Sequence, residues 1–243
     1  MPSDPIDAAN RAVLDHLVHE ALDLLDADRL DAAAANVAEA TALAPHDPAV
    51  LAARGQLAWA RGEPHEARDL FRRAVDRDPS QTDAHYALAR LAEDAGDHAT
   101  QVRHDLKVLA LDTAAHRRGG VGNRAQVALI EQIAEHVLQT LPEPFASRLA
   151  AVPVVLEPRP SVGLVQDGFD PRAFGLFEGP EDFGQRSHAV TDRPSRIVVF
   201  FANLLEAFAD EAELRTQVEV TLLHEIGHFF GLDEDRVAAL GLG

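Results

Sequence analysis

Similar residues recur at intervals of 34 positions in the first half of the chain, and this repeat limits the fold more than any other feature of the sequence. The matching pairs are Leu17 and Leu51, Ala33 and Ala67, Val37 and Phe71, Ala40 and Ala74, Pro45 and Pro79, and Gly62 and Gly96. Small residues at fixed positions let two helices pack closely, and a proline ends the second helix of each pair. Residues 8–115 are also rich in Ala and Leu and poor in β-branched residues. The sequence therefore predicts a stack of helix hairpins in this half.

The clearest copy of the repeat spans residues 48–79. It contains Gly55, Gly62, Ala67, Phe71 and Ala74 at consensus positions of tetratricopeptide repeats, and this half of the chain resembles that family. The copies on either side depart from the pattern, because Asp28 replaces a turn glycine and Asp105 and Thr113 replace a Phe and a Pro. A generic alanine-rich helical bundle is the alternative. The resemblance implies a surface that binds a peptide or a partner protein.

The residue pattern changes after HRRGGVGNR (116–124), whose glycines predict a linker or a tight turn. Beyond this segment, the spacing and type of the apolar residues predict helices at 125–140, 145–149 and 210–230, a short helix from about residue 234, and strands at 151–158 and 195–204. The glycine-rich stretch between the two strands is expected to be a loop. We thus expect an α+β fold, in which all-α helical repeats (8–115) and a linker (116–124) precede a small α+β domain (125–243).

The sequence TLLHEIGHFFGLDEDR contains the pattern HExxH on the predicted C-terminal helix. His224 and His228 lie one turn apart on one helix face, with their side chains about 5–6 Å apart, so both imidazoles can bind one metal ion. Glu225 projects about 100° around the helix, so it is expected to contact a metal-bound water rather than the ion. Two nitrogen donors with an oxygen donor favour Zn2+ over harder ions.

The third metal ligand is expected among the acidic residues after the helix. Gly231 follows His224 by seven positions and Glu234 follows it by ten, which gives the spacing HExxHxxGxxE. A helix that ends in a left-handed glycine can turn the chain back toward the metal. Glu234 is therefore the predicted third ligand, with Asp233 and Asp235 as alternatives, because a shift of one residue in the turn would exchange them.

This candidate site predicts a zinc metallopeptidase. The metal would lower the pKa of its water to about 7 and polarise a substrate carbonyl. Glu225, as the general base, would accept the water proton and transfer it to the leaving amine. The alternative is a non-catalytic repeat adaptor in which zinc only holds the C-terminal domain together. A catalytic zinc site leaves a coordination position for water, whereas a structural site has four protein ligands.

The region from about residue 125 to the C-terminus resembles the minimal zincin-like metallopeptidases of bacteria. The resemblance is carried by HEIGHFFGLDEDRVAAL, by LPEPFASRL followed by VPVVLEP, by FGLFEG (174–179) and by PSRIVVFFANLL. It implies that His224 and His228 bind zinc, that Glu225 is the base, and that an acidic residue after Gly231 is the third ligand. Phe229 stands where many members of that family have a histidine.

Residues outside the HExxH motif are further candidates. His188, Arg186 and Arg193, in the polar loop between the strands, are candidates for stabilising an oxyanion. Tyr86, the only tyrosine, is expected to be a packing residue of the repeats. The predicted strand Ile197–Phe201 has two interpretations. An extended substrate could pair with its edge as an additional strand, or the segment could be a buried strand of the core.

Composition excludes several other functions. The net charge of the chain is −18. Binding to nucleic acid or to an anionic membrane surface needs an excess of Lys and Arg, which this sequence does not have. The absence of cysteine excludes disulfides and thiolate ligands. The N-terminus has no secretory signal and no segment reaches about 18 uncharged apolar residues, so we expect a cytoplasmic protein without nucleic-acid or membrane partners. The expected partners are a peptide or protein substrate and a protein that binds the helical repeats.

Overall fold

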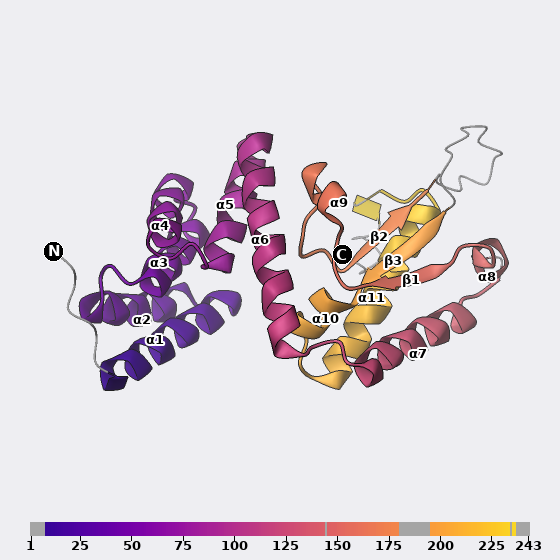
Figure 1. The fold of residues 1–243 in the computed structure, drawn as a ribbon, viewed down its shortest axis with the longest axis horizontal. Helices are drawn as coiled ribbons and strands as arrows, with labels where there is room; N and C mark the ends of the chain where they lie inside the picture. Colours follow the sequence, from indigo (N-terminus) through magenta and orange to yellow (C-terminus); the bar gives the residue numbers. More distant parts are fainter. Residues whose placement is uncertain (1–7, 144, 180–194, 234, 237–243) are drawn as a thin grey trace. The chain divides into compact units, whose positions relative to one another are not determined.

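The computed structural model describes residues 8–143, 145–179, 195–233 and 235–236, which form two compact units (Figure 1). The described residues up to Asp112, together with Gln166–Gly168, form the repeat unit. The described residues of Thr113–Val165 and those from Phe169 onward form the C-terminal unit. Helical repeats followed by a small domain of helices and one sheet confirm the expected α+β class.

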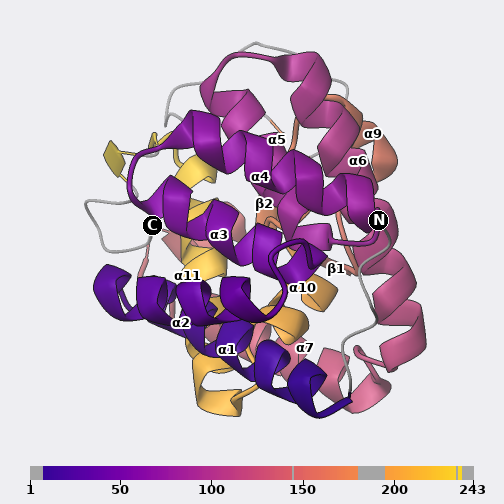
Figure 2. The same cartoon turned by 90° about the vertical axis from the view of Figure 1, so that its left-hand side faces the viewer.

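From Ala8 to Gly119 the described residues form six helices: α1 (Ala8–Asp26), α2 (Leu30–Leu43), α3 (Pro48–Ala60), α4 (Pro64–Arg77), α5 (Thr82–Asp94) and α6 (His98–Gly119). Helix α1 packs on α2, and α3 packs on α4 (Figure 2). The turns of the three copies share one conformation, because Asp28, Gly62 and Gly96 have φ angles of 54°, 75° and 70°. Aspartate is one of the few residues besides glycine that enters this left-handed region. The repeat is thus present in the backbone as well as in the sequence.

Phe71 lies at the centre of the repeat core. Its side chain is fully buried, and its ring occupies the space that a Cβ atom on Gly55 would need, because that atom would lie 2.7 Å from ring carbon Cε1. Trp59 meets the Phe71 ring edge-on at a centroid distance of 6.5 Å. The close approach of α3 and α4 therefore depends on the absence of a side chain at residue 55.

The third copy of the repeat replaces the apolar Phe with a buried ion pair. Asp105, at the position equivalent to Phe71, is fully buried. The Nη2 atom of Arg90 lies 2.8 Å from both carboxylate oxygens of Asp105, and the guanidinium lies 5.1 Å from the centre of the Tyr86 ring. The attraction of this charged partner offsets the cost of removing the Asp105 carboxylate from water. Contact with Arg90 also agrees with the packing role expected for Tyr86.

The rest of the chain contains α7 (Arg124–Thr140), α8 (Phe145–Leu149), β1 (Val154–Glu157), α9 (Val162–Gln166), β2 (Gly175–Glu178), β3 (Arg196–Phe200), α10 (Phe201–Ala207) and α11 (Glu211–Phe229). Asn123 caps α7 and forms a reciprocal capping box with Gln126. Asp210 caps α11, because its side chain accepts hydrogen bonds from two amides of the first turn. These caps explain why both long helices begin close to their predicted positions.

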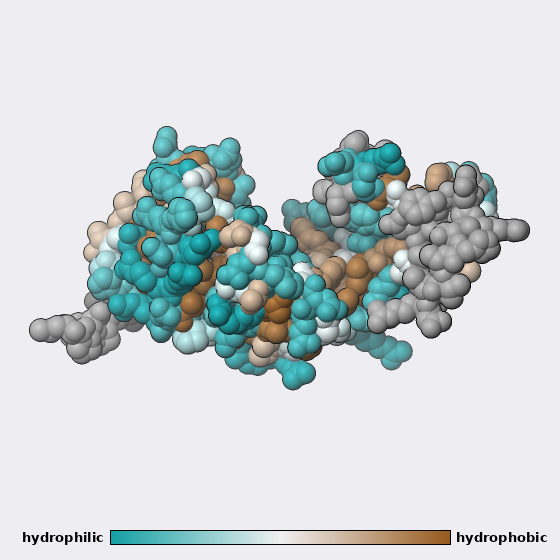
Figure 3. Space-filling view, turned by 90° about the horizontal axis from the view of Figure 1, so that it is seen from above, coloured by the Kyte–Doolittle hydropathy of each residue, from teal (hydrophilic) through white to brown (hydrophobic). Residues whose placement is uncertain are grey.

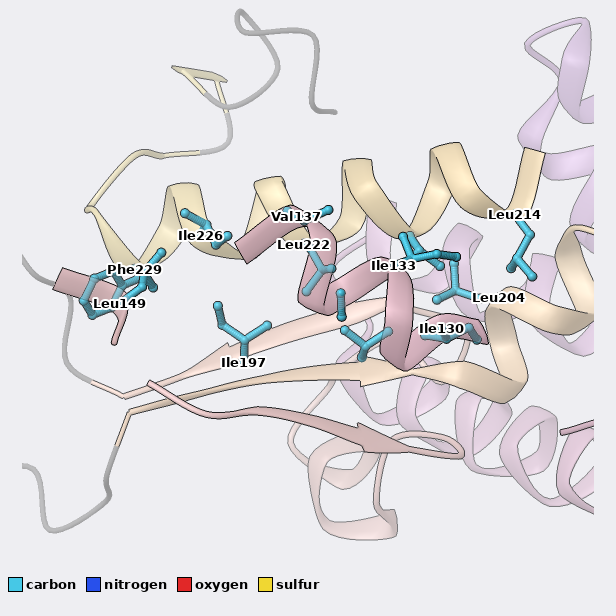
Figure 4. Close-up of a cluster of buried hydrophobic side chains, with 13 residues drawn as sticks. Ile130, Ile133, Val137, Leu149, Ile197, Leu204, Leu214, Leu222, Ile226 and Phe229 are labelled. Atoms are coloured by element: carbon cyan, nitrogen blue, oxygen red, sulfur yellow. The ribbon is translucent and has the colours of Figure 1, made fainter. Parts of the chain in front are cut away.

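Within the described ranges, three strands form one sheet in the order β1–β3–β2, with β1 parallel and β2 antiparallel to β3. Side chains of α7, α11 and β3, among them Ile133, Leu222 and Ile197, meet in the core of this unit (Figure 4). Strand β3 is central and almost wholly buried. The expectation that this strand binds a substrate at its edge is wrong, because both of its edges are paired. The alternative of a core strand is confirmed.

Several boundaries differ from those predicted. Strand β3 ends at Phe200 and α10 begins at Phe201, so the last four residues of the predicted strand 195–204 are helical. The predicted loop between the strands contains α9 and β2. Helix α6 continues to Gly119, within the segment predicted as a linker, while the boundary between the compact units follows Asp112. Short elements have weak local patterns, and their packing partners decide their conformation.

Hydrophilic residues cover most of the face of the repeat helices that Figure 3 displays. An α-helix needs about 20 consecutive apolar residues to cross a bilayer. Within the described ranges, no helix is long and apolar enough to do so.

Candidate metal centre

Helix α11 places His224 and His228 one turn apart. Their Nε2 atoms lie 2.9 Å from each other, and their ring centroids lie 4.6 Å apart. Both residues are half-buried. Zinc–imidazole bonds of about 2.0–2.1 Å let one ion contact both nitrogens at this separation. The structure therefore brings together the two histidines that their spacing predicts as a pair.

The turn after α11 orients the His228 ring. Gly231 has a φ of 74°, and the Leu232 amide donates to the Gly227 carbonyl at 3.0 Å, as in a Schellman turn. This turn places the Leu232 carbonyl 3.1 Å from Nδ1 of His228. A carbonyl only accepts, so Nδ1 carries the proton and Nε2 keeps its lone pair. His228 is thus held in the tautomer that a metal ligand at Nε2 requires.

Glu225 lies on the neighbouring face of α11 and is only 7% exposed. Its Cγ and Oε1 atoms lie against Gly175 of β2, at the place where another residue would have its side chain. Thr221, one turn earlier on α11, is also 7% exposed. A carboxylate in such a sheltered position is more typical of an acid–base group than of a solubilising surface charge.

A cleft of about 490 Å³ lies between α11 and the segment 169–177. Helix α11 contributes Gln217, Val220, Thr221, His224, Glu225 and His228, and the opposite wall contributes Phe169, Ala173, Phe174, Gly175, Leu176 and Phe177. Among these lining residues, only the two histidines and Glu225 are ionisable. The wall facing them is almost entirely apolar. A cleft of this kind suits a ligand with an apolar side chain next to a reactive polar group.

Buried polar residues hold the loop that forms the apolar wall. The Nδ2 atom of Asn203 donates to the carbonyls of Pro171 and Ala173, at 3.0 and 2.7 Å. Its Oδ1 atom accepts a hydrogen bond from Arg159, which also pairs with Glu206. Sequence reasoning missed this network. Asn203 and its partners are 30 or more positions apart in the chain, so no local motif marks them.

The remaining predicted site residues are not all described. Glu234, Arg186, His188 and Arg193 lie outside the described residues. Asp233 and Asp235 are exposed, and Oδ1 of Asp233 accepts the amide of Arg236 at 3.0 Å. In the described part of the chain, no group of three or more His, Cys, Asp or Glu is arranged to hold a metal ion. The third ligand therefore stays a prediction, with the same three acidic residues as candidates.

Helix α11 carries the HExxH motif beside a small mixed sheet. Two family models match parts of the chain. Residues 149–243 match the model of the Zincin-like metallopeptidase family, and residues 48–91 match a Tetratricopeptide repeat model. No curated protein matches the chain. The C-terminal half thus resembles zincin-like metallopeptidases, a family that implies zinc, and the N-terminal half resembles tetratricopeptide repeats, which implies binding of another protein.

Proposed function

We propose that this protein is a zinc-dependent peptidase whose helical repeats bind a protein substrate or partner. The observation that carries the proposal is the convergence of two imidazole Nε2 atoms, 2.9 Å apart, in a cleft that also contains a buried glutamate. The match of the C-terminal half to a metallopeptidase family supports the peptidase activity. The match to a repeat family supports the protein partner.

Two of the described residues, His224 and His228, suit a zinc ion by the chemistry and the separation of their Nε2 atoms. The Leu232 carbonyl holds the proton of His228 on Nδ1, so the His228 Nε2 lone pair faces His224. A zinc ion binds an imidazole nitrogen through its lone pair, so His224 as well must carry no proton on Nε2 when it acts as a ligand. Glu234, or Asp233 or Asp235 in its place, would add an oxygen ligand. Bound zinc would polarise the substrate carbonyl and lower the pKa of a water molecule.

Glu225 is the proposed general base. Its carboxylate lines the same cleft as the histidine pair and is largely shielded from solvent. There it accepts a proton from the attacking water and later gives this proton to the leaving nitrogen. The peptide bond breaks as that nitrogen becomes an amine. This role needs an oxygen of Glu225 that stays in one place between the two proton transfers.

Strand β2 offers an edge to an extended peptide. Among the described strands, β2 is an outer strand of the sheet. The Phe200 amide donates to the Phe174 carbonyl at 2.8 Å, so the alternation of antiparallel pairs turns the peptide groups of Gly175 and Phe177 away from β3. Both residues line the cleft. A substrate can pair with these groups as an added strand, which supports a peptide as the substrate.

Zinc content and cleavage of a denatured protein test the proposal. Wild type is expected to hold one zinc ion and to cleave. Glu225→Gln should keep the zinc and lose about 10²–10⁴-fold in kcat, because the base is gone while the ligands remain. Glu213→Gln, an exposed change on the same helix, is the matched control and should retain both properties.

Other results would reject the proposal. Zinc binding without cleavage by wild type would favour the alternative, a repeat adaptor with a structural zinc site. Equal cleavage by wild type and Glu225→Gln would remove the glutamate from the mechanism. A wild-type protein that binds no zinc would refute the metal site itself.

A further inference from the structure

We propose that Gly175 positions the Glu225 side chain through the space left by its missing Cβ atom. Gly175 is the first residue of β2, and it lies directly against Glu225 and Thr221 of α11 at the wall of the cleft. The catalytic role given to Glu225 rests on the function proposed above, whereas the packing of these two residues does not depend on it.

The space at Gly175 is filled by atoms of α11. A Cβ atom built on Gly175 would lie 2.8 Å from Oε1 of Glu225, 2.9 Å from its Cγ, and 2.8 Å from Cγ2 of Thr221. Contacts below 3.0 Å are essentially never made by real Cβ atoms. Two of the three nearest atoms belong to Glu225. Any residue with a side chain at position 175 therefore requires a shift of Glu225, Thr221 or the strand.

The backbone conformation does not explain a glycine here. Gly175 is absent from the residues with positive φ, and it lies in a regular strand opposite Val199. Other residues adopt this conformation readily, and glycine within a strand weakens it by about 0.5–1 kcal/mol relative to alanine. The remaining physical reason for a glycine at position 175 is that it leaves space for the side chains of the neighbouring helix α11.

If a Cβ atom were added at position 175, the end of the Glu225 side chain is the part that would move. Strand β2 is bound to β3 by its register, and it is held on α11 by the edge-on contact of Phe177 with Phe229, at a centroid distance of 5.6 Å. Thr221 is branched at Cβ and buried, so its methyl group has few positions available. A glutamate side chain has three rotatable bonds and moves at lower cost than a strand or a helix.

A shifted carboxylate loses its place for proton transfer. A general base must come within about 2.6–3.2 Å of its proton donor, and a displacement of about 1 Å can cost about 10²-fold in rate. The three atoms nearest to the added Cβ belong to Thr221 and Glu225, and to neither histidine. Alanine at position 175 should therefore leave the metal ligands in place while it displaces the base.

Thermal unfolding of the full chain tests the packing without reference to activity. Gly175→Ala is compared in the wild-type background and in the Glu225→Ala background, each with a chelator present. We expect Tm to fall by about 5 °C in the wild-type background, and by about half of that or less once the Glu225 atoms are absent. Gly163→Ala is the control, because its Cβ would meet nothing closer than Ser161 Oγ at 3.8 Å, and its Tm should not fall.

Zinc content and kinetics test the consequence. Gly175→Ala should still hold one zinc ion, with kcat lowered about 10²-fold and KM little changed. Adding Thr221→Ser, which removes the Cγ2 atom, should restore part of the lost kcat. Gly163→Ala should cleave at the wild-type rate.

Two results would overturn the inference. One is an equal fall in Tm for Gly175→Ala in both backgrounds, which would mean that the added Cβ does not press on Glu225. The other is a wild-type rate for Gly175→Ala from a wild type that does cleave. If wild type cleaves nothing, the proposed function fails, and the Tm comparison alone decides whether Gly175 positions Glu225.

Discussion

At the scale of single residues, the conformation of Gly231 at the end of α11 affects which nitrogen of His228 can bind a metal. Its φ of 74° is left-handed, and the chain reversal that follows brings the Leu232 carbonyl to Nδ1 of His228 at 3.1 Å. The Leu232 carbonyl therefore forms a hydrogen bond with His228, which is a proposed metal ligand. Hydrogen bonds of this kind fix both the tautomer and the orientation of the imidazole ring. The left-handed conformation of Gly231 thus determines that Nε2 of His228 is the nitrogen available to bind a metal.

Gly231→Ala is expected to weaken zinc binding. A residue with a Cβ atom in this conformation costs about 1–2 kcal/mol, and relaxation of the turn withdraws the Leu232 carbonyl from His228. We expect the zinc affinity to fall about 10–100-fold, as measured by competition with a chromophoric chelator. Gly96→Ala has the same strain at a φ of 70° but lies in the repeats, and it should bind zinc like wild type. Equal affinities for all three proteins would contradict the role of the turn.

At the scale of elements, polar contacts join α5 and α6, and two of them carry a consequence for stability. The first is the ion pair of Arg90 with the buried Asp105. The second is the contact of His85 Nδ1 with His104 Nδ1 at 2.9 Å. The other nitrogen of His85 faces the Pro79 carbonyl at 3.3 Å and must donate to it, so His104 supplies the hydrogen between the two rings. Burial of the rings lowers the pKa of both histidines, and that of His104 falls to about 4, helped by the charge of His85.

The histidine pair predicts a loss of stability in mild acid. In the unfolded chain the pKa of His104 is about 6.5, so the unfolded state binds more protons than the folded state between about pH 6.5 and 4. The free energy of unfolding therefore falls as the pH drops through this window. From pH 7 to pH 5 we expect wild type to lose about 1 kcal/mol more than His104→Gln, in urea titrations at both pH values. A parallel loss in both proteins would show that other groups cause the effect.

At the scale of the whole molecule, the two compact units have separate cores. The largest core cluster in the repeats gathers around Phe71, and the core of the C-terminal unit gathers around α7, α11 and the sheet. No residue belongs to both clusters. His224 and His228, the proposed metal ligands on α11, lie in the C-terminal unit. A ligand that binds only one folded unit stabilises that unit by mass action.

Zinc should therefore shift the unfolding of only part of the molecule. We expect calorimetry to resolve two transitions, of which one rises with added zinc and returns to its original Tm after chelation. Cleavage should be lost on chelation, while most of the helical circular dichroism persists because the repeats stay folded. The variant His224→Ala should have both transitions but no response to zinc. A single transition that rises as a whole would show that the units unfold together.

The parts that could be predicted are those with a local physical signal. The repeats were predictable because each copy must bury the same small and aromatic positions, such as Gly55 and Phe71. The pairing of His224 and His228 follows from helix geometry alone. By contrast, β2 has four residues and begins with a glycine, so its conformation depends on the pairing with β3 rather than on its own residues. The contact between His85 and His104 has no spacing rule, because the two rings come from different helices.

The sequence by itself determined the class of the fold and the residues that form the candidate metal pair, because helix periodicity and caps are properties of neighbouring residues. Only the tertiary structure decided what surrounds that pair. It set β3 in the centre of the sheet, placed the edge strand β2 against α11, and left room at Gly175 for Glu225. It also brought Asn203 to the loop that forms the apolar wall. These contacts join segments that are far apart in the chain, and their free energies depend on packing that no local pattern records.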